Sequence, residues 1–239
     1  MQGTNRVTAS AESKPGFGVR ASQQIATSTR LQISLFLLGL LLLYLLIRQV
    51  LNPGFSEYWG YSVVQLMLAM GLFVVLSVFL SDRGGISRLS QSLMVLVIYA
   101  DTLGTAEDFY HRFSGYDKII HTLGSAAVTS IIGDVLVALD LRGSISWPPR
   151  RILLVAAGIA IGGGFLWEVY EYLGDTVLNT GRHISATDTK FDLLSDTVGG
   201  IIGALLIYWQ YFRTSRHYAV NHAGHGIDQE SGRRSPLPE

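Results

Sequence analysis

The chain has 239 residues, of which 49% are hydrophobic and only 15% are charged, whereas a soluble domain usually carries about 25% charged residues. Its formal net charge is zero, which argues against nucleic acid as a partner. It contains no cysteine, which excludes disulfides, thiolate ligands and a cysteine nucleophile. Because polar residues gather near both ends and in short breaks between apolar runs, the composition is typical of a multi-pass membrane protein.

Six apolar segments are each about 20 residues long, which is enough to cross a membrane as a helix. We predict spans near residues 31–50, 59–80, 89–109, 117–139, 152–173 and 191–212. The predicted fold class is therefore all-α, a polytopic membrane bundle of six transmembrane helices. The transmembrane domain covers residues 31–213, and residues 1–30 and 214–239 are predicted to be disordered cytoplasmic tails.

The basic residues are distributed unevenly between the two ends of these spans. Thirteen of the 18 Lys and Arg residues lie in the two tails and in the loops on the same side of the membrane. By the positive-inside rule, both termini are expected in the cytoplasm.

Two short segments resemble each other and indicate an internal repeat. Residues 116–124 read YDKIIHTLG and residues 191–199 read FDLLSDTVG, and each segment opens a predicted span. We interpret the last four spans as a duplicated two-helix hairpin, related by an axis along the membrane normal. His121 is then equivalent to Asp196, and Asp117 to Asp192.

Ionisable residues of four spans lie at one depth. A helix rises about 1.5 Å per residue, so Glu107, His121, Glu168 and Asp196 each lie roughly 26–28 Å from the cytoplasmic end of their span. Charged groups at such depth usually face the interior of a bundle and pair there. Three further acids lie about one turn further out, namely Asp117, Glu171 and Asp192.

Carboxylates and a histidine that project inward from several helices are ligands suited to a divalent metal. We predict that His121, Glu168, Asp192 and Asp196 bind Mg, Mn, Zn or Ca, and that Glu171 and Glu168 are catalytic. Lys118, Arg182 and Asp117 are predicted to bind substrate, with Asp101 and Glu107 as floor or wall of the site. The alternative is a rim of solvated acids that form ordinary ion pairs.

Three other features of the spans have structural interpretations. Asp134 lies far along its span from the acidic cluster, meaning the predicted metal ligands His121, Glu168, Asp192 and Asp196 with their neighbouring acids. It is expected to make a helix–helix hydrogen bond. Two pairs of glycines four residues apart are expected to bring the fifth and sixth spans together, namely Gly158 with Gly162 and Gly199 with Gly203.

Three separated motifs resemble a known family. The motifs are Tyr116-Asp117-Lys118-x2-His121, Trp167-Glu168-x2-Glu171, and Asp188-x3-Asp192-x3-Asp196-x2-Gly199. Over residues 30–213 the chain looks like the YjdF-like family of uncharacterised bacterial integral membrane proteins, and more distantly it is similar to the VanZ-like family associated with glycopeptide resistance. The resemblance implies a multi-pass protein of the bacterial cytoplasmic (inner) membrane, but it implies no particular reaction.

Three functions stay open. The first is a divalent-metal-dependent enzyme that acts on a membrane lipid or a lipid-linked envelope precursor, whose headgroup lies at the depth of the acids. The second is a non-catalytic protein that binds a lipid headgroup or an antibiotic. The third is a cation-coupled transporter, which would need a polar path from the acids to the cytoplasm.

Overall fold

The computed structural model describes residues 17–53, 59–80, 86–178 and 185–213, and within these ranges the regular elements are all helical. The elements are α1 (Phe17–Leu51), α2 (Trp59–Phe79), α3 (Arg88–Ala106), α4 (Phe109–Arg112), α5 (Tyr116–Leu141), α6 (Pro149–Leu178) and α7 (Ala186–Ile207), followed by the π-helical turn η2 (Tyr208–Arg213). Every one of them except α4 and η2 is long and apolar enough to cross a membrane, so the prediction of an all-α bundle with six spans is confirmed.

The first helix begins earlier than predicted. Helix α1 has 35 residues and starts at Phe17, inside the segment predicted to be a tail. No proline interrupts residues 17–51, so the helix can continue beyond the apolar segment. The rest of the predicted N-terminal tail, and the predicted C-terminal tail, lie outside the described residues.

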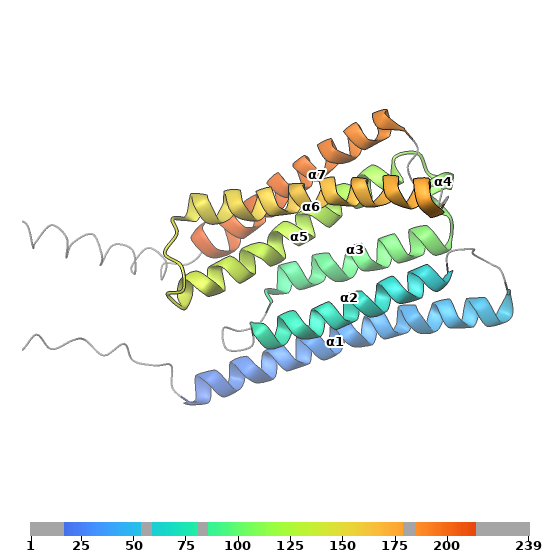
Figure 1. Cartoon of the computed structure of the whole chain (residues 1–239). Coiled ribbons are helices and arrows are strands. Elements are labelled where there is room, and N and C mark those ends of the chain that lie inside the picture. The colour runs from blue at the N-terminus through green and yellow to red at the C-terminus, as the bar shows by residue number, and fades with distance from the viewer. Residues whose placement is uncertain (1–16, 54–58, 81–85, 179–184, 214–239) are drawn as a thin grey trace, which may run out of the picture.

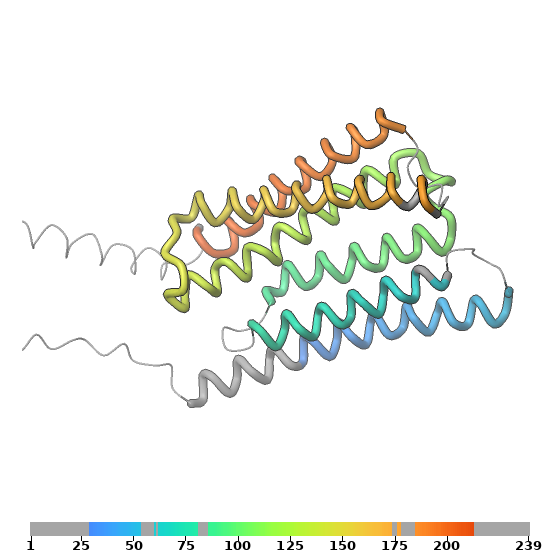
Figure 2. Tube along the Cα trace, in the orientation of Figure 1, coloured from blue at the N-terminus to red at the C-terminus, as the bar shows by residue number. Residues whose placement is uncertain are grey.

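The helices form two groups, which Figures 1 and 2 show one above the other. Helices α1, α2 and α3 pack on one another, and α5, α6 and α7 form the second group. Helix α3 packs against α5 and joins the groups. Helix α5 is the central element, because 61% of its spanning window is buried, against 33% or less in the other spans.

Glycines allow α7 to approach α5 closely. A Cβ atom on Gly199 would overlap the carbonyl oxygen of Thr122, and one on Gly203 would lie 2.6 Å from the Cβ of Thr129. These two glycines therefore face α5. The prediction that they contact the fifth span, α6, is wrong. The predicted contact role of Gly158 and Gly162 is also wrong, since a Cβ on either would meet nothing within 4 Å. A small-residue pair shows that a close contact is possible, but the neighbour that uses it depends on how the helices pack.

Asp134 makes the helix–helix hydrogen bonds that the sequence predicted. One of its carboxylate oxygens accepts from the backbone N–H of Ser87 at 2.9 Å, and the other accepts from the hydroxyl of Tyr211 at 2.7 Å. The buried carboxylate thereby connects α5 with the start of α3 and with η2, at the end of the bundle far from the acidic cluster. Its role is structural, because both oxygens stabilise contacts between elements.

The orientation of the protein in the membrane can be tested by labelling single introduced cysteines, because the chain has no cysteine of its own. Ser114 and Ser144 are both exposed, and they lie in loops at the two ends of α5. The excess of Arg and Lys predicts that Ser144 faces the cytoplasm. A membrane-impermeant thiol reagent applied to intact cells should therefore label Ser114→Cys and leave Ser144→Cys unlabelled until the cells are lysed. The reverse pattern would place the acidic cluster at the cytoplasmic side.

Candidate functional site

Three helices bring the predicted acids and histidine together at one end of the second helix group. Helix α5 begins at Tyr116 and presents Asp117 and His121 one turn apart. Helix α7 begins after the cap residue Ser185, whose hydroxyl accepts from the N–H of Asp188 at 3.2 Å. Because α7 starts this early, its aspartates at 188, 192 and 196 form one stripe. Glu168 of α6 completes the cluster.

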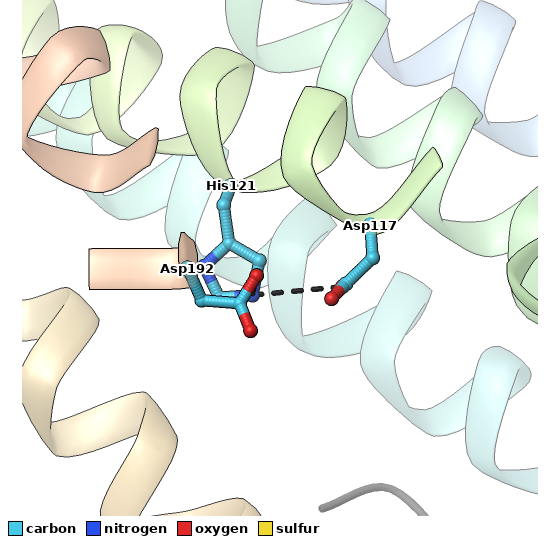
Figure 3. Close-up of side chains that lie close together, drawn as sticks. All are labelled: Asp117, His121 and Asp192. Carbon is cyan, nitrogen blue, oxygen red and sulfur yellow. Dashed lines mark ion pairs between the residues drawn. The ribbon is translucent and has the colours of Figure 1, made fainter. Parts of the chain in front are cut away.

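His121 lies at the centre of four carboxylates. Its Nε2 atom lies 3.6 Å from Asp117 Oδ1, 3.7 Å from Glu168 Oε1 and 3.8 Å from Asp192 Oδ1. Its other ring nitrogen, Nδ1, lies 3.3 Å from both carboxylate oxygens of Asp196. The side chains of His121, Glu168, Asp192 and Asp196 are all less than a tenth exposed. Figure 3 shows Asp117, His121 and Asp192 converging from two helices.

The two sides of the imidazole ring have different surroundings. Asp196, which the sequence analysis assigned as a metal ligand, lies on the Nδ1 side and accepts a hydrogen bond from Ser125 at 2.7 Å. Asp117, which had been assigned to substrate, lies on the Nε2 side. A metal ion could be held by Asp117, His121 and Asp192, whose ligand atoms all lie within 4.8 Å of one another. Asp196 lies outside this group, and both of its carboxylate oxygens are 3.3 Å from Nδ1 of His121.

Glu168 has a buried carboxylate oxygen that faces this group. Its Oε1 atom is inaccessible to solvent and has no hydrogen-bond partner among the described residues. The imidazole Nε2 at 3.7 Å is too far away for a hydrogen bond. Leaving a buried carboxylate oxygen unsatisfied is costly, and this oxygen lies 3.7 Å from Nε2 of His121, which belongs to the group that could hold a metal ion.

Lys118 neutralises part of the cluster. Its ammonium group lies 3.0 Å from Asp117, 2.5 Å from Asp188 and 2.6 Å from Asp192. Three carboxylates thus surround the side chain, which argues against the predicted use of its charge for binding substrate. Arg182, the other predicted cationic contact to substrate, lies outside the described residues.

A cavity of about 460 Å³ lies beside the cluster. The residues that line it include Asp117, His121 and Asp196 of the cluster, and Trp167 and Glu171 of α6. The indole N–H of Trp167 donates to Glu171 at 3.0 Å, which orients the carboxylate predicted to be catalytic. Apolar side chains of α2, α3, α5 and α6 form much of the remaining wall. This size and mixed lining are typical of a small-molecule site.

Asp101, which the sequence predicts as floor or wall of the site, is among the residues that line the cavity. Its carboxylate accepts hydrogen bonds from Gln65 of α2 and from Tyr110 of α4, the second at 2.6 Å. Burial and the neighbouring Asp101 raise the pKa of Tyr110, so its hydroxyl stays protonated and donates. Gln65 and Tyr110 were missed from the sequence, although an amide inside an apolar span was a usable signal.

Glu107 does not belong to the site, so its prediction as wall or floor is wrong. Its carboxylate accepts from the hydroxyl of Tyr44 and pairs with Arg48 at 3.2 Å, both on α1. Glu107 follows Asp101 by six residues, which at 3.6 residues per turn places it on a different face of α3. Equal depth therefore did not imply a common direction.

The fold and site define a polytopic α-helical membrane protein with a buried carboxylate–histidine cluster beside a cavity. The chain belongs to the family described as predicted membrane protein (DUF2238), whose sequence profile matches residues 33–213. An uncharacterized protein of Thermotoga maritima is 29% identical over 117 residues, which cover 47% of this chain and 57% of that protein. The match thus spans little more than half of the Thermotoga protein. No solved structure matches the chain.

The family agrees with the expectation of an uncharacterised membrane protein family. It does not carry the names YjdF-like or VanZ-like, and those finer resemblances stay predictions.

Proposed function

We propose that this membrane protein is a divalent-cation-dependent enzyme that acts on a lipid or a lipid-linked precursor bound in the cavity. The observation that carries the proposal is the buried Nε2 of His121, which faces three carboxylates at 3.6–3.8 Å beside a cavity of about 460 Å³. The excess of basic residues at the opposite end of the spans favours the outer face of the membrane for this site.

The spacing of the polar atoms favours a cation. Ligand atoms bound at about 2.1–2.4 Å to one ion lie roughly 3.0–3.9 Å from one another, which covers the distances from Nε2 to the three carboxylates. Direct hydrogen bonds from the imidazole would be shorter. The separations therefore suit ligands around a cation better than an imidazole bonded directly to the acids.

Asp196 has the geometry of a supporting residue. Histidine ligands commonly donate their second N–H to a carboxylate, which sets the tautomer and directs the other nitrogen to the metal. Asp196 lies on the Nδ1 side of His121, and Ser125 orients Asp196 in turn. This arrangement would keep the lone pair of Nε2 directed toward Asp117 and Asp192.

The cavity supplies the place for chemistry. A divalent cation would polarise a substrate oxygen at the wall formed by Asp117 and His121. Glu171 lines the same cavity, and Trp167 orients its carboxylate, so Glu171 is our candidate general base. Glu168, which is not among the lining residues, is better placed as a ligand than as a base.

A binding protein without chemistry is the second candidate, because the same cavity could hold a lipid headgroup or an antibiotic, as the resemblance to the VanZ-like family suggests. A cation-coupled transporter has less support. A polar path from the cluster to the cytoplasm would have to use Asp101 and Asp134, and Asp134 makes structural hydrogen bonds with Ser87 and Tyr211.

Metal analysis of purified protein tests the proposal. Wild-type protein dialysed against trace divalent metals should retain about one equivalent, and Asp192→Asn should retain almost none. Asp196→Asn should bind the same metal about 10–100-fold more weakly, because it loses only the support of His121.

A matched control is Asp140→Asn, at the far end of α5. Its carboxylate accepts from the N–H of Trp147, which the amide oxygen of asparagine can replace. This variant should bind metal as the wild type does. Equal and negligible metal in all four proteins would refute the metal site, and the binding protein would become the leading function.

A further inference from the structure

The cavity beside the cluster has a strongly one-sided charge. Among the described residues that line it are five carboxylates, from Asp101, Asp108, Asp117, Glu171 and Asp196. The same set includes two histidines but no lysine or arginine. A low-dielectric cavity lined by one sign of charge concentrates ligands of the opposite sign. The lining therefore favours a cationic ligand and opposes an anionic one.

Asp101 and Gln65, which both line the cavity, can accept further hydrogen bonds. The two carboxylate oxygens of Asp101 accept from Gln65 and Tyr110, which are uncharged, and each carboxylate oxygen can accept more than one hydrogen bond. The amide oxygen of Gln65 is buried and has no hydrogen-bond partner among the described residues. An ammonium group offers three donors and a positive charge, so it satisfies both side chains at once.

The rest of the wall suits an alkyl chain. Apolar side chains from four helices line the cavity, namely Ala69, Val97, Ile98, Ile120, Val128 and Ala160. Helix α2 packs with α1 and α3, whereas α6 packs with α5 and α7, so these two helices bound the cavity from different groups. Trp167 adds an aromatic ring, whose face can bind a cation and can also pack against methylene groups.

We propose that the cavity takes a cationic amphiphile, with an ammonium group against Asp101 and Gln65 and an alkyl chain along the apolar wall. This inference rests on the proposed function, since it names the class of substrate that the same site would take. It departs from the expectation that Lys118 binds the substrate, because Lys118 is surrounded by Asp117, Asp188 and Asp192 and is not among the described residues that line the cavity.

Calorimetry with three probes of equal chain length tests the proposal. Decylammonium, decanol and decanoate are titrated into protein in nanodiscs of a neutral lipid, with empty nanodiscs as the blank. EDTA is present, so that the result does not depend on the metal site. Decylammonium should bind at least about tenfold more tightly than decanoate, and Asp101→Asn should weaken its binding by about tenfold or more.

Two comparisons keep the test decisive. Decanol should bind Asp101→Asn as it binds the wild type, which shows that the variant is folded and that only the charge effect is lost. Asp140→Asn, whose carboxylate lies at the other end of α5, should leave decylammonium binding unchanged. Equal binding of decylammonium and decanoate to the wild type, or of decylammonium to wild type and Asp101→Asn, would overturn the proposal whether or not a metal binds.

The natural source of the ammonium group is distinguished by competition. If the ligand is an amine-bearing membrane lipid, phosphatidylethanolamine in the nanodisc should displace decylammonium, and phosphatidylglycerol should not. If the ligand is a free cationic amphiphile, neither lipid should compete, while the dependence on Asp101 persists. Displacement by phosphatidylglycerol alone would contradict the charge argument.

Discussion

Lys118→Met is expected to lower the free energy of unfolding by about 3 kcal/mol. Its ammonium group lies within 3.0 Å of Asp117, Asp188 and Asp192, so its loss leaves three neighbouring carboxylates to repel one another. Removing one partner of a fully buried ion pair costs about 3–5 kcal/mol. The lower end applies because the side chain of Lys118 is 27% exposed and water screens part of the repulsion. Thermal unfolding of the protein in a neutral detergent measures the change.

Lys190→Met is the matched control, because Lys190 lies in the first turns of α7 near the same acids but is exposed. It should change the stability by less than about 0.5 kcal/mol. A divalent cation should restore part of the stability of Lys118→Met, since Asp117 and Asp192 belong to the group that could hold a metal. If Lys118→Met and Lys190→Met unfold alike, the acids do not depend on the lysine and the cluster is solvated.

Gly199→Ala should destabilise the protein by about 1–3 kcal/mol or more, although it adds a single methyl group. The new Cβ would overlap the carbonyl oxygen of Thr122 and lie 2.9 Å from the Cβ of Ser125. Backbone atoms cannot rotate away, so α7 must shift from α5. Since Ser125 and His121 hold Asp196 from α5, the shift should also weaken the predicted metal binding. Thermal unfolding and metal affinity are measured on the same samples.

Gly158→Ala makes the same chemical change where the added methyl meets nothing within 4 Å. It should leave metal affinity unchanged and stabilise α6 by up to about 1 kcal/mol, because alanine is the better helix former. Equal stability of the two glycine variants would mean that α5 and α7 are not in close contact at Gly199, and the geometry around Asp196 would have to be revised.

The six spans and the depth of the polar residues could be predicted from the sequence alone. Span length follows from membrane thickness, and depth follows from the constant rise of a helix. Facing within one helix was also predictable, since Asp117 with His121 and Asp192 with Asp196 are each one turn apart. The convergence of His121, Glu168 and Asp196 agrees with this local reasoning, because charged groups at equal depth avoid lipid. The duplication of the last four spans stays a prediction.

Which neighbour each side chain meets was decided only by the tertiary structure. Glu107 has the predicted depth but points to Tyr44 and Arg48 of α1, and Gly199 contacts α5 instead of α6. Asp196 lies beside Nδ1 of His121 and Asp117 lies beside Nε2. Which carboxylate lies beside which nitrogen depends on the rotation of α5 and α7 about their axes. The periodicity of one helix specifies its own polar face, but the partner of that face is set by non-local packing among helices whose apolar surfaces are nearly equivalent in lipid.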